Sequence, residues 1–225
     1  MFPHNRAGVV QWLECFLAKE EVGGSNPLTR SNHTGPNNDP KCYSMKNVCV
    51  FLSASTVDKK YADAACELGE LLVKNGYRLV YGGNSKGLME IISSAVLKSG
   101  GEVIGVTMEV LKHLQKPDVP EMIIAKDLSE RKRIFNEKSD AFVVMVGGIG
   151  TLDEATEVLE LKKHAIHSKP IVFLNTDDFY AGLKIQLKKM NDEGFLPAQF
   201  EGLVHFAETP QQVIDLLHET LGEES

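Results

Sequence analysis

One stretch of the sequence, from Asp140 to Glu154, constrains the fold more than any other. Its first half, Asp140 to Val146, is a short apolar run rich in β-branched residues, which is typical of a strand covered on both faces. Three glycines interrupt the run: Gly147, Gly148 and Gly150. Apolar residues at helical spacing follow them. The pattern predicts a buried strand, a glycine turn and the start of a helix.

A glycine turn that leads into a helix N-terminus is suited to bind an anion. Free backbone N–H groups and the positive end of the helix dipole point toward the same place, and glycine allows a phosphate to come close. Thr151 and Glu154 stand three residues apart at the start of this helix, and that pair alone favours a capping box. The two interpretations are compatible, because Thr151 can cap the helix while Glu154 presents a carboxylate beside a bound phosphate.

From Val48 onward, short apolar runs alternate with amphipathic segments. Strands are predicted at 48–53, 78–81, 102–106, 122–125, 140–146, 170–174 and 203–206. Helices are predicted at 58–75, 87–99, 128–139, 151–164, 180–190 and 210–221, and a loop at 111–120. This alternation predicts an α/β fold that is Rossmann-like and doubly wound, with a mainly parallel sheet and helices on both faces.

Three polar or glycine-rich turns follow predicted strands. They are Ser53-Ala-Ser55, Gly82-Gly-Asn84 and Gly147-Gly-Ile-Gly150. In parallel α/β sheets, ligands bind at the carboxyl ends of the strands. Because these ends meet at one edge of the sheet, we expect all three turns to face one ligand site.

A basic run begins another predicted helix at Glu130-Arg-Lys-Arg133. Positive charge in a first helical turn is disfavoured by a few tenths of a kcal/mol, and a bound anion would reverse that cost. A solvated basic turn is the alternative. The preceding strand is predicted to end at the same sheet edge as the glycine turns, so we favour a position for Arg131 and Lys132 close to the bound phosphate.

The composition narrows the classes of function. The 225 residues are 43% hydrophobic, enough for one domain with a substantial core. A net charge of -7 argues against a nucleic-acid polymer as the main partner, though not against a nucleotide. No apolar run approaches the ~20 residues that a membrane span needs. The four cysteines lack metal-ligand spacing, and Cys49 and Cys66 are expected to be reduced, which predicts a cytoplasmic protein.

No cofactor and no metal are expected from the motifs. Neither glycine turn carries the Gly-Lys-Ser/Thr ending of a P-loop, and Asp153 stands where a dinucleotide fingerprint needs its third glycine. His164 and His167 end a predicted helix without obvious carboxylate or thiol partners. Asp153, Glu157 and Glu160 are expected to be surface charges of that helix.

Residues 1–44 differ from the rest of the chain. The part from Thr29 to Tyr43 is dense in Asn, Pro, Ser and Gly, which predicts disorder. Gly24-Ser-Asn-Pro27 resembles the conceptual translation of a transfer-RNA gene, and Met45 stands just before the first predicted strand. We therefore expect 1–44 to be a disordered or non-native leader and 45–225 to be one nucleotide-binding domain. A flexible interaction tail is the alternative for the leader, and intact-mass analysis of the natural protein would decide.

The ordered motifs resemble those of the LOG family, the cytokinin riboside 5′-monophosphate phosphoribohydrolases, which are often called lysine decarboxylases. Gly147 to Glu154 is similar to the family's PGGxGTxxE signature. Further matching motifs are Tyr81-Gly-Gly with Gly87-Leu-Met89, Gly101-Glu-Val-Ile-Gly105, Glu130-Arg-Lys132 and His167-Ser-Lys-Pro170. Together they extend over residues 47–206.

This resemblance implies a homodimer or higher homo-oligomer that acts on a nucleoside 5′-monophosphate, either AMP or an N6-modified, cytokinin-type AMP. Hydrolysis of the N-glycosidic bond would give free base and ribose 5-phosphate without a cofactor. Arg131 and Glu154 match the catalytic pair. Gly147, Gly148, Gly150 and Thr151 match the phosphate-binding turn, and Ser53, Ser55, Gly83 and Lys132 match positions around the nucleotide.

The sequence departs from the family pattern at several positions near these motifs. Val146 replaces the signature proline, Asn84 a glycine of the YGGG run, and Glu90 the glycine after Gly-Leu-Met. An inward-pointing Glu90 would disfavour a phosphate. The alternative function is a non-catalytic nucleotide or molybdenum-cofactor carrier on the same scaffold. The presence of both Arg131 and Glu154 favours the enzyme. A pyridoxal-dependent decarboxylase lacks support, because no lysine stands in a Schiff-base context.

Overall fold

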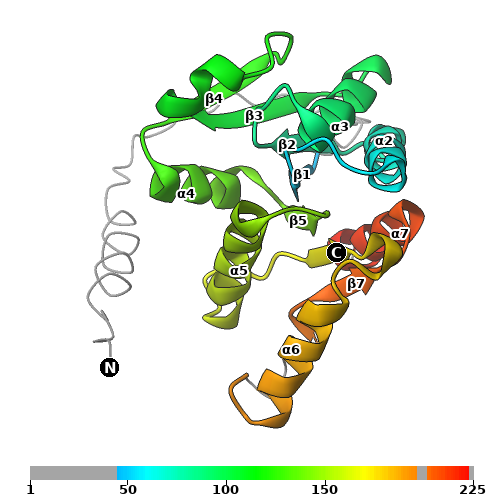
Figure 1. Cartoon of the computed structure of the whole chain (residues 1–225), viewed down its shortest axis with the longest axis vertical. Helices are drawn as coiled ribbons and strands as arrows, with labels where there is room; N and C mark the ends of the chain where they lie inside the picture. The colour runs from blue at the N-terminus through cyan, green and yellow to red at the C-terminus, as the bar shows by residue number, and fades with distance from the viewer. Residues whose placement is uncertain (1–44, 197–201, 223–225) are drawn as a thin grey trace, which may run out of the picture. The chain divides into compact units, whose positions relative to one another are not determined.

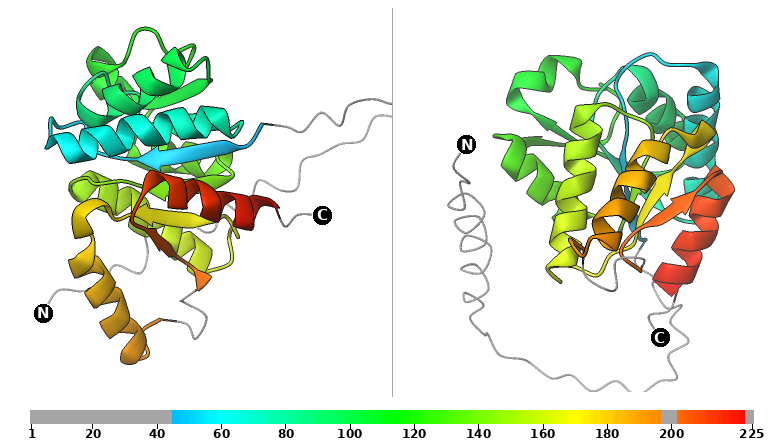
Figure 2. Two further views of the ribbon diagram at one scale, coloured as in Figure 1. Left: turned by 90° about the vertical axis from the view of Figure 1, so that its right-hand side faces the viewer. Right: turned by 60° about the horizontal axis from the view of Figure 1, so that its bottom comes forward.

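The computed structural model in Figures 1 and 2 describes residues 45–196 and 202–222. The leader expected at 1–44 lies outside the described residues. The strands are β1 (Asn47–Phe51), β2 (Arg78–Tyr81), β3 (Val103–Met108), β4 (Glu121–Ala125), β5 (Ala141–Val144), β6 (Ile171–Leu174) and β7 (His205–Ala207). The helices are α2 (Lys59–Lys74), α3 (Gly87–Lys98), α4 (Leu128–Lys138), α5 (Ile149–Lys163), α6 (Ala181–Asp192) and α7 (Pro210–Gly222), with short 3-10 helices η1 (Glu109–Leu114) and η2 (Thr176–Asp178).

The strands form one seven-stranded sheet in the order β4-β3-β2-β1-β5-β6-β7. Every neighbouring pair in it is parallel. The predicted α/β, doubly wound fold is confirmed. The chain builds outward from β1 through β2 to β4, then returns to place β5 on the other side of β1. This reversal is the topological switch point at which such folds bind ligands.

Two apolar layers cover the sheet, and successive residues of β1 point into different ones. Val48 and Val50 pack with residues of α2, α3 and α7, whereas Cys49 and Phe51 pack with α4, α5 and α6. This alternation explains why β1 is apolar at nearly every position, since a strand buried on both faces has no solvent side.

Local sequence signals set several helix boundaries. Asp58 accepts a hydrogen bond from the Lys60 N–H at the start of α2. At α4, Asp127 accepts from the Glu130 N–H at 2.8 Å, and the Glu130 carboxylate accepts from the Lys126 N–H at 2.7 Å. This reciprocal arrangement resembles a capping box. It fixes the start of α4 and therefore the position of Arg131, the fourth residue of that helix.

Three expectations from the sequence need correction. The stretch 111–120, expected to be a loop, begins inside η1, because Glu109–Leu114 closes into a 3-10 helix. The last strand, at His205–Ala207, begins two residues later and ends one residue later than predicted. The basic run does not share one first turn, because α4 begins at Leu128 and leaves only Arg131 in that turn. In the described residues, no helix is long and apolar enough to cross a membrane.

Candidate active site

The three turns predicted to share one sheet edge do so. They follow β1, β2 and β5, which are adjacent in the sheet. The backbone ties them together, since the Ser53 N–H donates to the Val146 carbonyl at 3.2 Å and the Met89 N–H donates to the Ser53 carbonyl at 3.3 Å. Within the first turn, the Ser55 N–H donates to the Ser53 hydroxyl at 3.0 Å.

The glycine turn after β5 leads directly into α5, but not as the capping-box pattern predicts. The N-cap residue is Gly148, and the helix begins at Ile149. Thr151 is therefore the third helical residue, and only 5% of it is exposed. The capping-box prediction for Thr151 was wrong, because the helix starts two residues earlier than expected.

The consequence is a helix N-terminus without a side-chain cap. Gly148 has no side chain to accept from the N–H groups of the first turn, which leaves them for an anion. Thr151 packs against the turn instead, and a Cβ atom added to Gly147 would overlap its side chain. By contrast, a Cβ atom at Gly148 or Gly150 would meet no described atom within 4 Å.

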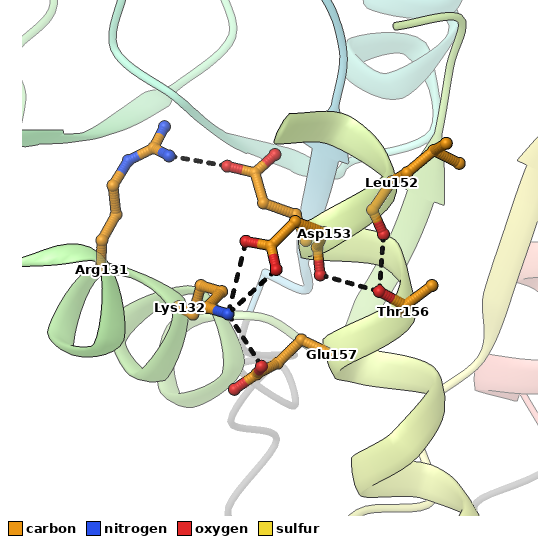
Figure 3. A network of polar contacts seen from close by, with 7 residues as sticks. Arg131, Lys132, Leu152, Asp153, Thr156 and Glu157 are labelled. Carbon is orange, nitrogen blue, oxygen red and sulfur yellow. Dashed lines mark hydrogen bonds and ion pairs between the residues drawn. The ribbon is translucent and has the colours of Figure 1, made fainter. Parts of the chain in front are cut away.

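Arg131 of α4 and Glu154 of α5 form a buried ion pair beside this turn. Arg131 Nη1 lies 2.7 Å from Glu154 Oε1, and each residue is 8% exposed. The Arg131 Nε–H also donates to the Val106 carbonyl at 2.9 Å, and the guanidinium lies 4.8 Å from the centroid of the Phe135 ring. Figure 3 shows the Arg131 side chain extending from α4 toward α5, and its hydrogen bond to Glu154 joins the two helices. Backbone, ring and carboxylate together hold the guanidinium in one orientation.

Burial is the main influence on the Glu154 carboxyl group. Loss of hydration raises the pKa of Glu154, and the guanidinium of Arg131 opposes that shift. A carboxylate in such surroundings interacts strongly with nearby charge, because little water screens it. It is suited to face a substrate that becomes positively charged as it reacts.

The turn after β2 completes the surroundings of Arg131. A Cβ atom added to Gly82 would lie 2.7 Å from Arg131 Nη2 and 2.8 Å from Met89 Cε. The guanidinium therefore lies directly against the backbone of this turn, and a larger residue at position 82 would displace Arg131 or Met89. The next residue, Gly83, has φ +74°, a left-handed conformation that also favours glycine.

Lys132 joins α4 to α5 through a second set of contacts. Its Nζ lies 2.9 Å from Glu157 Oε2 and 3.4 Å from the Asp153 carboxylate, as Figure 3 shows. Asp153 is exposed, as expected for a surface charge of this helix, whereas Glu157 is only half-exposed, and both pair with Lys132. The sequence did not reveal this, because the partners are more than 20 residues apart. Glu160 does pair at the surface, with Lys163 and His164.

The histidines at the end of α5 have other partners. His164 Nε2 lies 2.9 Å from the Glu160 carboxylate. His167 is held between the Val158 carbonyl, 3.0 Å from its Nε2, and the Lys169 N–H, 3.2 Å from its Nδ1. Burial, with help from the Lys169 charge, lowers the pKa of His167 to about 4. Within the described ranges, no three His, Cys, Asp or Glu residues are grouped to hold a metal ion.

Sequence comparisons identify the relatives of this chain. A probable cytokinin riboside 5′-monophosphate phosphoribohydrolase, LOGL2 of Oryza sativa subsp. japonica, is 40% identical over 177 residues, 77% of this chain and 72% of the relative. The chain belongs to the LOG family. A sequence model of the family described as "Possible lysine decarboxylase" matches residues 89–217. Another LOG protein, the cytokinin riboside 5′-monophosphate phosphoribohydrolase LOG2 of Arabidopsis thaliana, is 36% identical over 77% of this chain and 83% of its own length.

Solved structures show the same fold in proteins that are named for molybdenum cofactor binding. The molybdenum cofactor carrier protein of Chlamydomonas reinhardtii is 25% identical, with a TM-score of 0.62 over 80% of this chain and 100% of that protein. The molybdenum cofactor binding protein of Rippkaea orientalis is 24% identical, with a TM-score of 0.63 over 80% of this chain and 99% of that protein. The predicted family and the predicted fold are both confirmed.

Proposed function

We propose that the protein hydrolyses the N-glycosidic bond of nucleoside 5′-monophosphates, either AMP or N6-modified AMP of the cytokinin type. The products are the free base and ribose 5-phosphate. The observation that carries the proposal is the buried pair of Arg131 and Glu154, which lies beside an uncapped helix N-terminus at the switch point of the sheet. The activity named for the LOG relatives supports the same reaction.

The 5′-phosphate is proposed to bind at the glycine turn. The first-turn N–H groups of α5 provide donors, and the helix dipole favours negative charge there. Open space around Gly148 and Gly150 allows a phosphate to approach the backbone. Gly147 and Thr151 are proposed to fix the shape of the turn, because the threonine side chain packs against that glycine.

The sugar is proposed to lie against Glu154. In the reaction the C1′–N bond breaks and its electron pair leaves with the base, so positive charge develops on the ribose. The carboxylate of Glu154 stabilises this charge and orients the water that adds to C1′. The water gives up one proton, and the departing base takes up one. Arg131 holds Glu154 and contributes positive charge to the anionic end of the substrate.

The remaining predicted residues are proposed to lie around the nucleotide. Ser53 and Ser55 follow β1, and Gly83 follows β2, so all three lie at the edge that also carries the glycine turn. Lys132 is held by Glu157 and Asp153 at the α4–α5 junction, one residue from Arg131. We propose that it contributes positive charge near the phosphate from that position.

The decisive test is incubation of the purified protein with AMP and with an N6-prenylated AMP. Chromatography should show release of the free base together with ribose 5-phosphate. If the protein binds both nucleotides but releases base from neither, the proposal is refuted.

A nucleotide or molybdenum-cofactor carrier is the second candidate. The likeness to the Chlamydomonas carrier favours it. A carrier has no need for a carboxylate buried beside an anion site, because that charge opposes binding. Tight nucleotide binding without base release would establish the carrier.

We also propose that the enzyme acts in the cytoplasm as a homodimer or a larger homo-oligomer. Exposed apolar side chains from three neighbouring elements support self-association: Val110 of η1 is 73% exposed, Ile124 of β4 41% and Leu128 of α4 56%. Sedimentation velocity should give at least twice the monomer mass. A monomer at micromolar concentration would refute this part of the proposal.

A further inference from the structure

Three charged side chains of the described residues are buried, and the candidate pair accounts for only two of them. The third is Lys116, which follows η1 and is 6% exposed. Removing an ammonium group from water is costly unless hydrogen bonds and opposite charge replace the lost hydration. A lysine in this position therefore needs partners that hold it firmly.

The surroundings of Lys116 supply those partners. Its Nζ lies 2.7 Å from Glu90 Oε1, 2.8 Å from Ser94 Oγ and 3.4 Å from Asp118 Oδ1. The Ser94 hydroxyl donates in turn to Glu90 Oε1 at 2.7 Å. The three donors of the ammonium group are thus matched by three oxygens, and two of those oxygens belong to α3.

The backbone of the same segment is joined to the turn after β2. The Lys116 N–H donates to the Gly83 carbonyl at 2.9 Å, and the Ser85 N–H donates to the Leu114 carbonyl at 2.9 Å. Asn84 and Gln115 form an antiparallel bridge between these two bonds. Residues 114–116 and 83–85 are therefore paired along their length, like two short strands.

The start of α3 connects this turn to the first one. The Met89 N–H bonds the Ser53 carbonyl, and Gly87 lies so close to Ala54 and Ser55 that a Cβ atom there would overlap their backbone. Glu90 is one residue beyond Met89. The ion pair between Glu90 and Lys116 therefore restrains the start of α3. This part of α3 connects the turn after β1 with the turn after β2.

We propose that Lys116 is a positioning residue for the nucleotide site. Its ion pair with Glu90 fixes residues 114–116 against the turn that carries Gly83, and so keeps that turn in the shape that binds the nucleotide. Glu90 is directed to Lys116, which removes the expected conflict between its carboxylate and a bound phosphate. The role rests on the proposed function, because it concerns the same site.

The test compares the variants Lys116→Met and Glu90→Gln with the double variant. If the pair shapes the binding turn, each single variant raises KM for AMP by about 10-fold and changes kcat by less than about twofold. The double variant should be no worse than Lys116→Met, because the two side chains act as one unit. Lys116→Arg, which keeps a cation, should recover part of the affinity.

Lys112→Met is the matched control. Lys112 belongs to η1 and is half-exposed, with a 3.6 Å contact to Glu109. The KM of Lys112→Met for AMP should equal that of the unmodified protein. A purely structural role for Lys116 would lower the melting temperature of Lys116→Met and leave KM unchanged well below that temperature. This outcome would overturn the proposal.

A binding measurement keeps the test independent of catalysis. Calorimetric titration with AMP should show the same weakening, about 10-fold, in Lys116→Met and Glu90→Gln. If the unmodified protein binds AMP but releases no base, the proposed hydrolysis fails while the titration still tests Lys116. Unchanged affinity in both variants would refute the role of Lys116 and leave the proposed hydrolysis intact.

Discussion

Arg131 Nη1 and Glu154 Oε1 lie 2.7 Å apart, although they belong to different helices and are separated by 23 residues in the sequence. Both side chains are almost fully enclosed, with exposures of 9% and 10%. A buried pair of this kind contributes little net stability, but loss of one partner leaves the other charge uncompensated. The pair is better explained by chemistry at this place than by a need for stability.

Replacement of Glu154 by glutamine should separate catalysis from folding. The amide preserves the shape and can still accept from Arg131, but it carries no charge to stabilise the developing cation. We expect base release to fall by at least about 100-fold at a temperature where the variant is folded. The melting temperature should also fall, because the buried guanidinium of Arg131 loses its opposite charge. Glu160→Gln is the control, since Glu160 lies exposed on the same helix and pairs with Lys163. Full activity in Glu154→Gln would remove Glu154 from the mechanism.

Replacement of Arg131 should affect stability as well. Arg131→Ala leaves the Glu154 carboxylate buried and unpaired, which should lower the free energy of unfolding by about 3 kcal/mol. In the double variant Arg131→Ala/Glu154→Gln, the unpaired charge is gone and part of that loss should return. Denaturant titration of the four proteins measures the coupling. Strict additivity of the two changes would show that the ion pair is energetically irrelevant.

Alanine substitutions in the glycine turn after β5 should affect different properties at different positions. Gly147→Ala places a methyl group on the Thr151 side chain, so we expect destabilisation by about 1–3 kcal/mol. Gly148→Ala meets no described atom within 4 Å, so the fold should tolerate it. If a phosphate occupies this space, Gly148→Ala should raise KM for AMP by about 10-fold or more. Unchanged KM in a stable Gly148→Ala protein would place the phosphate elsewhere.

The acidic side of the pH–rate profile should reflect Glu154. Burial raises the pKa of this carboxyl group, and the mechanism needs the ionised form. Activity should therefore be complete above the raised pKa and fall as the pH decreases through it, beginning at a higher pH than for an ordinary glutamate. The residual activity of Glu154→Gln should lack this limb, while Glu160→Gln should retain it. A profile identical in all three proteins would contradict the assignment.

Acid should destabilise the fold through His167. Its pKa is lowered to about 4 in the folded protein, whereas the unfolded chain takes up the proton near pH 6.5. The unfolded state therefore binds more protons between these values, and stability is lost as the pH falls from 6.5 toward 4. The expected slope is on the order of 1 kcal/mol per pH unit. Urea titrations of His167→Gln should show a shallower slope, and those of the exposed His164→Gln should match the unmodified protein.

The order of elements could be predicted from local patterns. Each strand was indicated by an apolar run and each helix by its periodicity, and β2 was predicted with both ends correct at Arg78 and Tyr81. The meeting of three turns at one edge followed from the rule for parallel sheets. These features depend on residues that are close together in the sequence, so one sequence contains the information.

Contacts between distant residues could not be predicted in the same way. The partner of Glu90 is Lys116, 26 residues later, and the partner of Lys132 is Glu157, 25 residues later. Nothing in the spacing of these residues indicates a contact. The capping prediction for Thr151 failed for another reason. Glycine can occupy the N-cap position of a helix as threonine can, and Gly148 occupies it in α5.

The direction of β1 has a practical consequence. The chain enters this strand at Asn47, and Ser53, at the edge proposed to bind the nucleotide, lies beyond its far end. Five residues of extended backbone, at about 3.3 Å each, separate the two edges. An affinity tag or a fluorescent protein joined ahead of Met45 would thus emerge behind the sheet, and an enzyme immobilised through that linker would turn its working face toward the solution.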